Sequence, residues 1–152
     1  MCVAAGGSGV LWKQESARSC LFPVDALFPF GVQIMRILHV EDDEDTRTLV
    51  AFVLQSEGWD VVAVDSEKAA IDLAESGAFD LYLLDNWIGG DTEHALCRTL
   101  RSVDPKTPIL FYSGAVFPKD VETALACGAQ GYLAKPCTPE ALIKAIAKLT
   151  RR

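Results

Sequence analysis

The sequence predicts an α/β protein in which a doubly wound, five-stranded parallel sheet carries helices on both faces. Two observations lead to this prediction. Five short apolar runs alternate with helix-type patterns from residue 36 to residue 150. The segments between the runs are long enough for helical crossovers, which make successive strands parallel. Apolar runs of this kind are typical of strands covered on both faces, and the ligand site of such a sheet lies at the carboxyl ends of its strands.

Length and composition exclude several classes of protein. A chain of 152 residues, half of them hydrophobic, is sufficient for one domain with a real core. A net charge of −7 argues against a nucleic-acid surface, which needs clustered Lys and Arg. No apolar run approaches the roughly 20 residues of a membrane span. The 5 cysteines include no CxxC pair, so we expect idle or buried thiols in a reducing cytosol rather than a zinc site.

Residues 1–34 differ from the rest of the chain. They contain glycines, prolines and scattered aromatics without a sustained period of 2 or 3.6, and they lack the basic start of a secretory signal. We expect a poorly ordered extension over 1–34 and a folded domain over 35–152. Met35 directly precedes the first strand, so the extension can reflect an upstream start choice. A segment that interacts through its Leu and Phe residues is the alternative.

The first half of the domain is expected to form a strand, a helix, a second strand and a second helix. Residues 36–40 form a short buried strand. Asp43 or Glu44 opens a helix that ends at Gly58. The apolar face of this helix is expected at Leu49, Phe52 and Val53. A second strand follows over residues 59–64. The next helix is capped by Ser66, ends at Gly77, and carries Ala69, Ala70, Ile71 and Leu73.

The second half continues the alternation. A third strand over 79–85 leads through a glycine-containing loop into a helix that carries Leu96 and Leu100. A fourth strand over 108–113 precedes a short helix that ends at Gly128. That helix carries Val121, Ala124 and Leu125. A fifth strand covers 131–135, and the last helix runs roughly from 139 to 150. Its buried residues are expected to be Leu142, Ile143, Ile146 and Leu149.

Polar side chains gather at the carboxyl ends of four of these strands. They are Glu41, Asp42 and Asp43 after the first, Asp85 after the third, Ser113 after the fourth and Lys135 after the fifth. Clustered carboxylates repel one another unless a cation or proton intervenes. Mg²⁺ prefers such oxygen ligands, and a carboxylate beside it can act as a nucleophile that forms an aspartyl phosphate. The pattern therefore indicates phosphoryl transfer, with Lys135 neutralising phosphoryl charge and Ser113 donating a hydrogen bond.

Four motifs at these strand ends carry a family resemblance. "VEDDED", "DLYLLDNW", "ILFYSGA" and "GYLAKP" together resemble the receiver domain of bacterial two-component response regulators, of the single-domain chemotaxis type. The resemblance covers residue 36 to about residue 150. It implies a flavodoxin-like sheet of order 2-1-3-4-5. It also implies that Asp85 accepts a phosphoryl group from a phosphohistidine of a sensor histidine kinase or a phosphotransfer protein.

The resemblance also assigns roles to the other site residues. Glu41 and Asp42 match the acidic pair, with Asp42 binding Mg²⁺ directly and Glu41 acting more through water. Asp85 and the backbone carbonyl of Trp87 supply further ligands. Lys135 matches the lysine of the family, with a cis bond to the following proline.

A pair of switch residues is implied as well. Ser113 matches the hydroxyl-bearing switch residue and Tyr132 its aromatic partner. For Tyr132 a second interpretation stays open, that of a half-buried strand aromatic. In the family the signal leaves by the face made of the fourth helix, the fifth strand and the fifth helix.

The remaining polar residues have simpler interpretations. Asp43, Glu44 and Asp45 are charges at a helix start, favoured by the helix dipole. Arg47 is interpreted as a surface helix residue. Asp80 begins the third strand at the end away from the site.

Both histidines and the loop after the third strand have structural interpretations as well. His39 is expected in the core and His94 exposed on its helix, while Asp91 caps that helix. The loop has glycines where many relatives have a proline, which permits more backbone freedom. A hypothesis follows for Trp87, two residues past the acceptor: its indole shields the acyl phosphate and lengthens the phosphorylated lifetime.

The sequence thus predicts a cytoplasmic, stand-alone receiver that is a signalling domain rather than an enzyme. Because no DNA-binding segment follows before Arg152, output is expected through an unknown downstream protein or through phosphorylation-dependent dimerisation, with no nucleic acid or membrane as partner. A pseudo-receiver that binds proteins without phosphorylation is the first alternative. A Mg²⁺-dependent phosphatase would want a second Asp where Trp87 stands. A flavodoxin would want a phosphate loop after the first strand.

Overall fold

The computed structural model describes residues 33–86, 88 and 94–151. The expectations for the extension over 1–34, for the carbonyl and the shielding role of Trp87, and for Asp91 concern residues that lie wholly or mostly outside this part of the chain. They stay predictions.

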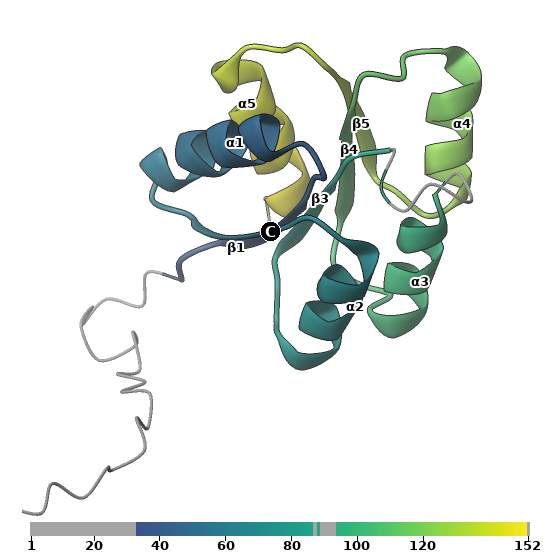
Figure 1. The fold of residues 1–152 in the computed structure, drawn as a ribbon, viewed down its shortest axis with the longest axis horizontal. Coiled ribbons are helices and arrows are strands. Elements are labelled where there is room, and N and C mark those ends of the chain that lie inside the picture. Colours follow the sequence, from purple (N-terminus) through teal and green to yellow (C-terminus); the bar gives the residue numbers. More distant parts are fainter. Residues whose placement is uncertain (1–32, 87, 89–93, 152) are drawn as a thin grey trace, which may run out of the picture. The chain divides into compact units, whose positions relative to one another are not determined.

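Five parallel strands form one sheet in the order β2-β1-β3-β4-β5. The strands are β1 (Arg36–Val40), β2 (Asp60–Val64), β3 (Leu81–Leu84), β4 (Ile109–Ser113) and β5 (Gly131–Ala134). The helices are α1 (Glu44–Ser56), α2 (Glu67–Ser76), α3 (Ala95–Val103), α4 (Pro118–Ala126) and α5 (Pro139–Thr150). In Figure 1, α1 and α5 lie on one face of the sheet, and α2, α3 and α4 on the other. The predicted fold class and strand order are confirmed.

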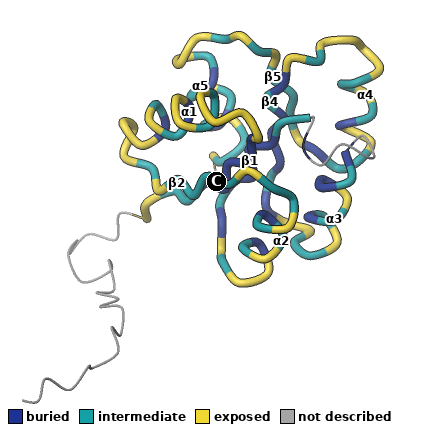
Figure 2. The backbone as a smooth tube through the Cα atoms, in the orientation of Figure 1, coloured by how far each residue is buried: buried dark blue, intermediate teal, exposed yellow. Residues whose placement is uncertain are grey.

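The sheet separates two apolar layers, because successive side chains of a strand point to opposite faces. Leu38 and Val40 of β1 pack with residues of α2, α3 and α4. Ile37, the neighbour of Leu38 in β1, points to the opposite face and packs with residues of α1 and α5. Figure 2 shows the result as a dark, buried centre of strands inside a mostly exposed helical surface. Burial on both faces explains why the strands read as continuous apolar runs.

The helix ends follow local chemistry. Asp43 is the N-cap of α1, and its carboxylate accepts a hydrogen bond from the Thr46 amide. Thr138 caps α5 in the same way. Gly58 and Gly128, just past α1 and α4, have φ angles of 81° and 99°. Such left-handed conformations are tolerated by glycine and end a helix sharply. Among the described residues, no helix is both long enough and apolar enough to cross a membrane.

The predicted apolar face of α1 is wrong at Leu49 and Phe52, whereas its third residue, Val53, is half-buried. Leu49 and Phe52 are 63% and 69% exposed, while Val50 and Leu54 are buried against the sheet. Residues four apart lie on the same side of a helix, so Val50 and Leu54 form an apolar stripe that fits the helical period as well as the predicted one does. The helix offers more apolar residues than one face can bury. In α5 the predicted burial of Leu142 and Ile146 is confirmed, while Ile143 and Leu149 are only half-buried.

The prediction for His94 is also wrong. The side chain is 4% exposed, and its ring meets the ring of Phe111 edge-on at a centroid distance of 5.0 Å. His94 occupies the N-cap position of α3 with φ 66°, so the chain enters the helix through a left-handed turn that directs the ring inward. Asp91, the helix cap expected from the sequence, lies outside the described residues. His39, in contrast, is in the core as predicted.

Candidate functional site

The carboxyl ends of β1, β3, β4 and β5 lie side by side, which brings the predicted site residues together. Val40 at the end of β1 is paired with Leu84 at the end of β3. Further along the same sheet, Ser113 at the end of β4 is paired with Ala134 at the end of β5. Glu41, Asp85 and Lys135 directly follow three of these strand ends. Segments up to 94 positions apart in the chain therefore meet at one edge. The geometry on which the prediction depended is present.

Three carboxylates form the acidic part of the site. Glu41, Asp42 and Asp85 each offer an oxygen, and these oxygens all lie within 4.8 Å of one another. Glu41 is 1% exposed and the side chain of Asp85 is 9% exposed, whereas Asp42 faces solvent. Three hard oxygen donors with one open side fit the preferences of Mg²⁺, which keeps several waters. The donor set thus fits the metal expected from the sequence.

Lys135 provides a positive charge beside these acids. Its Nζ lies 2.5 Å from Oε2 of Glu41 and 3.6 Å from Oδ1 of Asp85. Burial raises the pKa of the Glu41 carboxyl; the hydrogen bond from Lys135 works against this effect, and the charge of Asp85 adds to it. One ammonium faces two buried carboxylates, so the site has excess negative charge that a cation would neutralise.

Backbone hydrogen bonds fix the positions of the acids. The Asp85 amide donates to the Val40 carbonyl at 3.0 Å, and the Asn86 amide donates to Oδ1 of Asp85 at 2.7 Å. The Asp43 amide donates to Oε1 of Glu41 at 3.3 Å. These hydrogen bonds hold the carboxylates on short turns directly after the strands.

Sequence reasoning missed the part played by Arg47. Its guanidinium donates to the carbonyls of Glu41 and Asp42, at 2.8 and 3.1 Å, so it is a half-buried brace of the loop and not simply a surface residue. The signal was its place in the first turn of α1, from which a long side chain can reach back over the preceding loop. A guanidinium is suited to this task because it has several donors in a fixed plane.

Ser113 and Tyr132 lie next to each other at the β4 end. Ser113 is fully buried, and its Oγ accepts a hydrogen bond from the Ala115 amide at 3.3 Å. The Tyr132 hydroxyl donates to the Ala115 carbonyl. The Tyr132 ring stacks on Phe111, with centroids 6.0 Å apart. Burial raises the pKa of the Tyr132 hydroxyl, which stays protonated near neutrality. Both predicted switch residues thus contact the same residue of the β4–α4 loop.

Three further predictions, for Asp43, Lys135 and Asp80, are confirmed. Asp43 is a helix cap, and its hydrogen bonds with Thr46 lower the pKa of its carboxyl. The Lys135–Pro136 bond is cis. Asp80 lies at the far end of the sheet, where its carboxylate accepts from the Arg36 amide.

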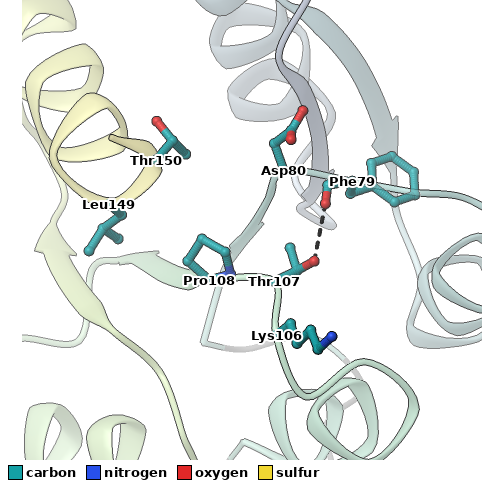
Figure 3. A pocket seen from close by; sticks show the side chains of 7 residues that line it. All are labelled: Phe79, Asp80, Lys106, Thr107, Pro108, Leu149 and Thr150. Carbon is teal, nitrogen blue, oxygen red and sulfur yellow. Dashed lines mark hydrogen bonds between the residues drawn. The ribbon is translucent and has the colours of Figure 1, made fainter. Parts of the chain in front are cut away.

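A pocket of about 340 Å³ lies at that far end as well, before β3 and β4 and beside the end of α5 (Figure 3). Its lining consists of Phe79, Asp80, Lys106, Thr107, Pro108, Leu149 and Thr150. The Thr107 hydroxyl is occupied by a hydrogen bond to the Phe79 carbonyl. The pocket contains none of the clustered acids and is separate from the candidate site.

Comparison with known proteins assigns the family. The model of the response regulator receiver domain matches residues 37–147, and the chain belongs to this family of phosphoacceptor signalling domains from two-component systems. The cell cycle response regulator CtrA of Brucella ovis is 35% identical over 118 residues, which are 78% of this chain and 51% of CtrA. The chain therefore spans about half the length of the curated relatives it matches.

Solved structures agree with the family. The chemotaxis response regulator CheY4 of Vibrio cholerae matches with a TM-score of 0.71 and 28% identity, over 77% of this chain and 99% of CheY4. The receiver domain of the sensor histidine kinase PA1611 from Pseudomonas aeruginosa matches with a TM-score of 0.71 and 26% identity, over 78% and 98% of the two chains. That structure has a magnesium ion coordinated in its active-site cleft.

Proposed function

We propose that this receiver accepts a phosphoryl group on Asp85 in a Mg²⁺-dependent reaction and signals through a change of conformation. The donor is a phosphohistidine of a sensor histidine kinase or of a phosphotransfer protein. One observation carries the proposal: Glu41, Asp42 and Asp85 place oxygens within 4.8 Å of one another. The ammonium of Lys135 lies against two of the three.

Asp42 and Asp85 would hold Mg²⁺ directly, with Glu41 acting more through water. The family pattern adds the backbone carbonyl of Trp87, which is not among the described residues. When bound, Mg²⁺ neutralises negative charge on the carboxylates and on the phosphoryl oxygens. The magnesium ion in the PA1611 receiver supports this assignment.

Asp85 is placed to act as the nucleophile. One of its carboxylate oxygens forms a bond to phosphorus while the bond from phosphorus to the donor's imidazole nitrogen breaks, and the electron pair of that bond goes to the nitrogen. Lys135 lies 3.6 Å from Oδ1 of Asp85, where its charge offsets the charge of the arriving group. Ser113 offers its hydroxyl to a phosphoryl oxygen. Receiver domains are signalling domains rather than classical enzymes, and the chemistry proposed here is limited to self-catalysed phosphorylation and dephosphorylation.

The signal would leave through the β4–α4 loop. Phosphorylation brings about −1.5 to −2 units of charge to the acceptor side chain. When Ser113 turns towards the phosphoryl group, it alters the loop that its Oγ and the Tyr132 hydroxyl both contact through Ala115. The populations of two packings of α4, β5 and α5 then shift. A downstream protein, or a second copy of the chain, reads that face.

The test is incubation with Mg²⁺ and acetyl phosphate, followed by intact mass spectrometry. The wild-type chain should gain the mass of one phosphoryl group. Asp85→Asn should abolish the adduct, because an amide cannot act as the nucleophile. Asp80→Asn is the matched control: it keeps an acceptor oxygen for the Arg36 amide and should be phosphorylated normally. Absence of any adduct in the wild type would favour the pseudo-receiver, and turnover of an exogenous phosphate ester would favour the phosphatase.

A further inference from the structure

The ammonium of Lys135 has a third neighbour besides the two carboxylates. Its Nζ lies over the ring of Tyr112, 5.1 Å from the ring centroid. The face of an aromatic ring carries partial negative charge and attracts a cation at this distance. The side chain of Lys135 is only 21% exposed, so little water competes for the contact. Lys135 is thus held between two acids and an aromatic face.

Tyr112 itself is fixed in place by the sheet. It lies in β4, paired with Leu133 of β5, and points to the face opposite that of its neighbours Phe111 and Ser113. On that face its ring packs against the apolar layer shared with α1 and α5. Burial, followed by the neighbouring Cys137, raises the pKa of the Tyr112 hydroxyl to about 12. Because of this pKa the hydroxyl stays protonated and the side chain neutral. Because of its packing the ring stays in one place, where the longer lysine side chain contacts it.

We propose that Tyr112 is a positioning residue for phosphoryl transfer: its ring face holds the Lys135 ammonium at the gap between Glu41 and Asp85. The inference rests on the proposed function of Asp85 and names a residue outside the set of acids, hydroxyl and lysine. A lysine on a flexible four-carbon stem has many orientations open to it. The ring restricts those orientations by holding Nζ 5.1 Å from its centroid, and it does so with its face and not with its hydroxyl.

Two variants of Tyr112 separate the ring from the hydroxyl. Tyr112→Phe keeps the aromatic face, and Tyr112→Leu removes it while keeping an apolar side chain. Phosphorylation by acetyl phosphate at saturating Mg²⁺ should stay within about twofold of wild type in Tyr112→Phe, and fall about fivefold in Tyr112→Leu, the scale of one cation–π contact. Leu110→Val is the matched control. It loosens packing on the same strand face, two residues away, and should lower thermal stability without lowering the rate.

A spectroscopic readout tests the contact directly. The Hε protons of Lys135, assigned by comparison with Lys135→Arg, should be shifted upfield by the ring current in wild type and in Tyr112→Phe. In Tyr112→Leu they should return to the position of an ordinary lysine. This readout does not depend on phosphorylation or on the stability of the variant beyond its being folded.

Three results would overturn the inference. In the first, the Phe and Leu variants lose rate equally. In the second, the Leu variant keeps the wild-type rate. In the third, no ring-current shift is seen in wild type. Each would leave the function of Asp85 intact, provided the wild type still gains its phosphoryl group. A wild-type chain that gains none overturns the proposed function and this inference together, so the two failures are distinguishable.

Discussion

At the scale of single residues, Lys135 contributes the positive charge of the site. It contacts Glu41 and Asp85, and within the described residues no other cationic side chain forms a salt bridge with either acid. If a phosphoryl group is transferred here as proposed, a charge with little solvent access would stabilise that group more than it would in water.

Replacing Lys135 by Ala should therefore slow phosphorylation by acetyl phosphate about 10²-fold, the usual effect of removing one such group. The chain should still bind Mg²⁺, since the three carboxylates remain. Lys144→Ala removes an exposed lysine of α5 and is the control. Equal rates in wild type and Lys135→Ala would show that the ammonium has no part in the reaction.

His39 is the second residue with a measurable charge effect. Burial lowers the pKa of its imidazole to about 4, with the charges of Lys135 and Arg47 adding to the effect, while its hydrogen bond to the Leu83 carbonyl opposes it. In the folded chain the ring is therefore neutral at pH values where the unfolded chain already binds a proton. Protons then favour the unfolded state.

The free energy of unfolding should consequently fall as the pH drops from about 6.5 to about 4, by about 3 kcal/mol from this group. The stability that depends on neutral His39 is fully present above pH 6.5. It is fully lost by about pH 4, below which this group causes no further change. Urea unfolding of wild type and His39→Val in EDTA, across this range, measures it. The free energy of unfolding of wild type minus that of His39→Val should fall by about 3 kcal/mol as the pH drops from about 6.5 to about 4. A difference independent of pH would contradict the buried, neutral state of His39.

At the scale of secondary-structure elements, the turn from β1 into α1 determines where two of the three acids lie. Arg47 in the first turn of α1 reaches back and donates to the carbonyls of Glu41 and Asp42. Asp43 caps the same helix from the loop. The loop is thus braced from both ends by charge-assisted hydrogen bonds.

Arg47→Ala should weaken Mg²⁺ binding about tenfold, as expected when a group that orients metal ligands is removed. Isothermal titration with MgCl₂ measures this effect. Arg47→Lys should recover only part of the affinity, because an ammonium cannot reproduce the planar set of donors. Thr48→Ala, at the next and exposed position of the helix, is the control. Unchanged affinity in Arg47→Ala would show that the loop holds its shape without the brace.

The elements also show how far sequence reasoning reaches. Strand positions were predictable because burial on both faces leaves unbroken apolar runs, and the residues that follow Val40, Leu84 and Ala134 could then be assigned to one edge of the sheet. The buried stripe of α1 was not predictable, since Leu49 and Phe52 compete with Val50 and Leu54 on composition alone. Only the packing against α5 and the sheet decides between them.

The failures at His94 and Arg47 have a different cause. His94 itself has the left-handed φ of 66° before α3, and no helical pattern in the sequence indicates such a conformation. Arg47 donates to backbone carbonyls, which every residue possesses, so its place in the first turn of α1 shows that it can reach the loop but not which carbonyls it contacts. Both depend on local backbone geometry.

At the scale of the whole molecule, the two ends of the sheet carry different features. The acids, Ser113 and Lys135 lie at the carboxyl ends of the strands, and Asp80 and the pocket of Figure 3 lie at the amino ends. The two layers of helices enclose the strands on both faces (Figure 1). Ser113 and Tyr132 both form hydrogen bonds with Ala115 of the β4–α4 loop, the route by which we propose that the signal leaves the acidic end.

The central claim is that the phosphoryl group is carried by Asp85. An acyl phosphate on an aspartate is reduced by borohydride to the alcohol, which leaves homoserine in the chain. After phosphorylation in Mg²⁺, borohydride reduction and proteolysis, peptide mass spectrometry should find homoserine at position 85 alone. Homoserine at another aspartate, or none at all from a protein that had gained the phosphoryl mass, would contradict the account.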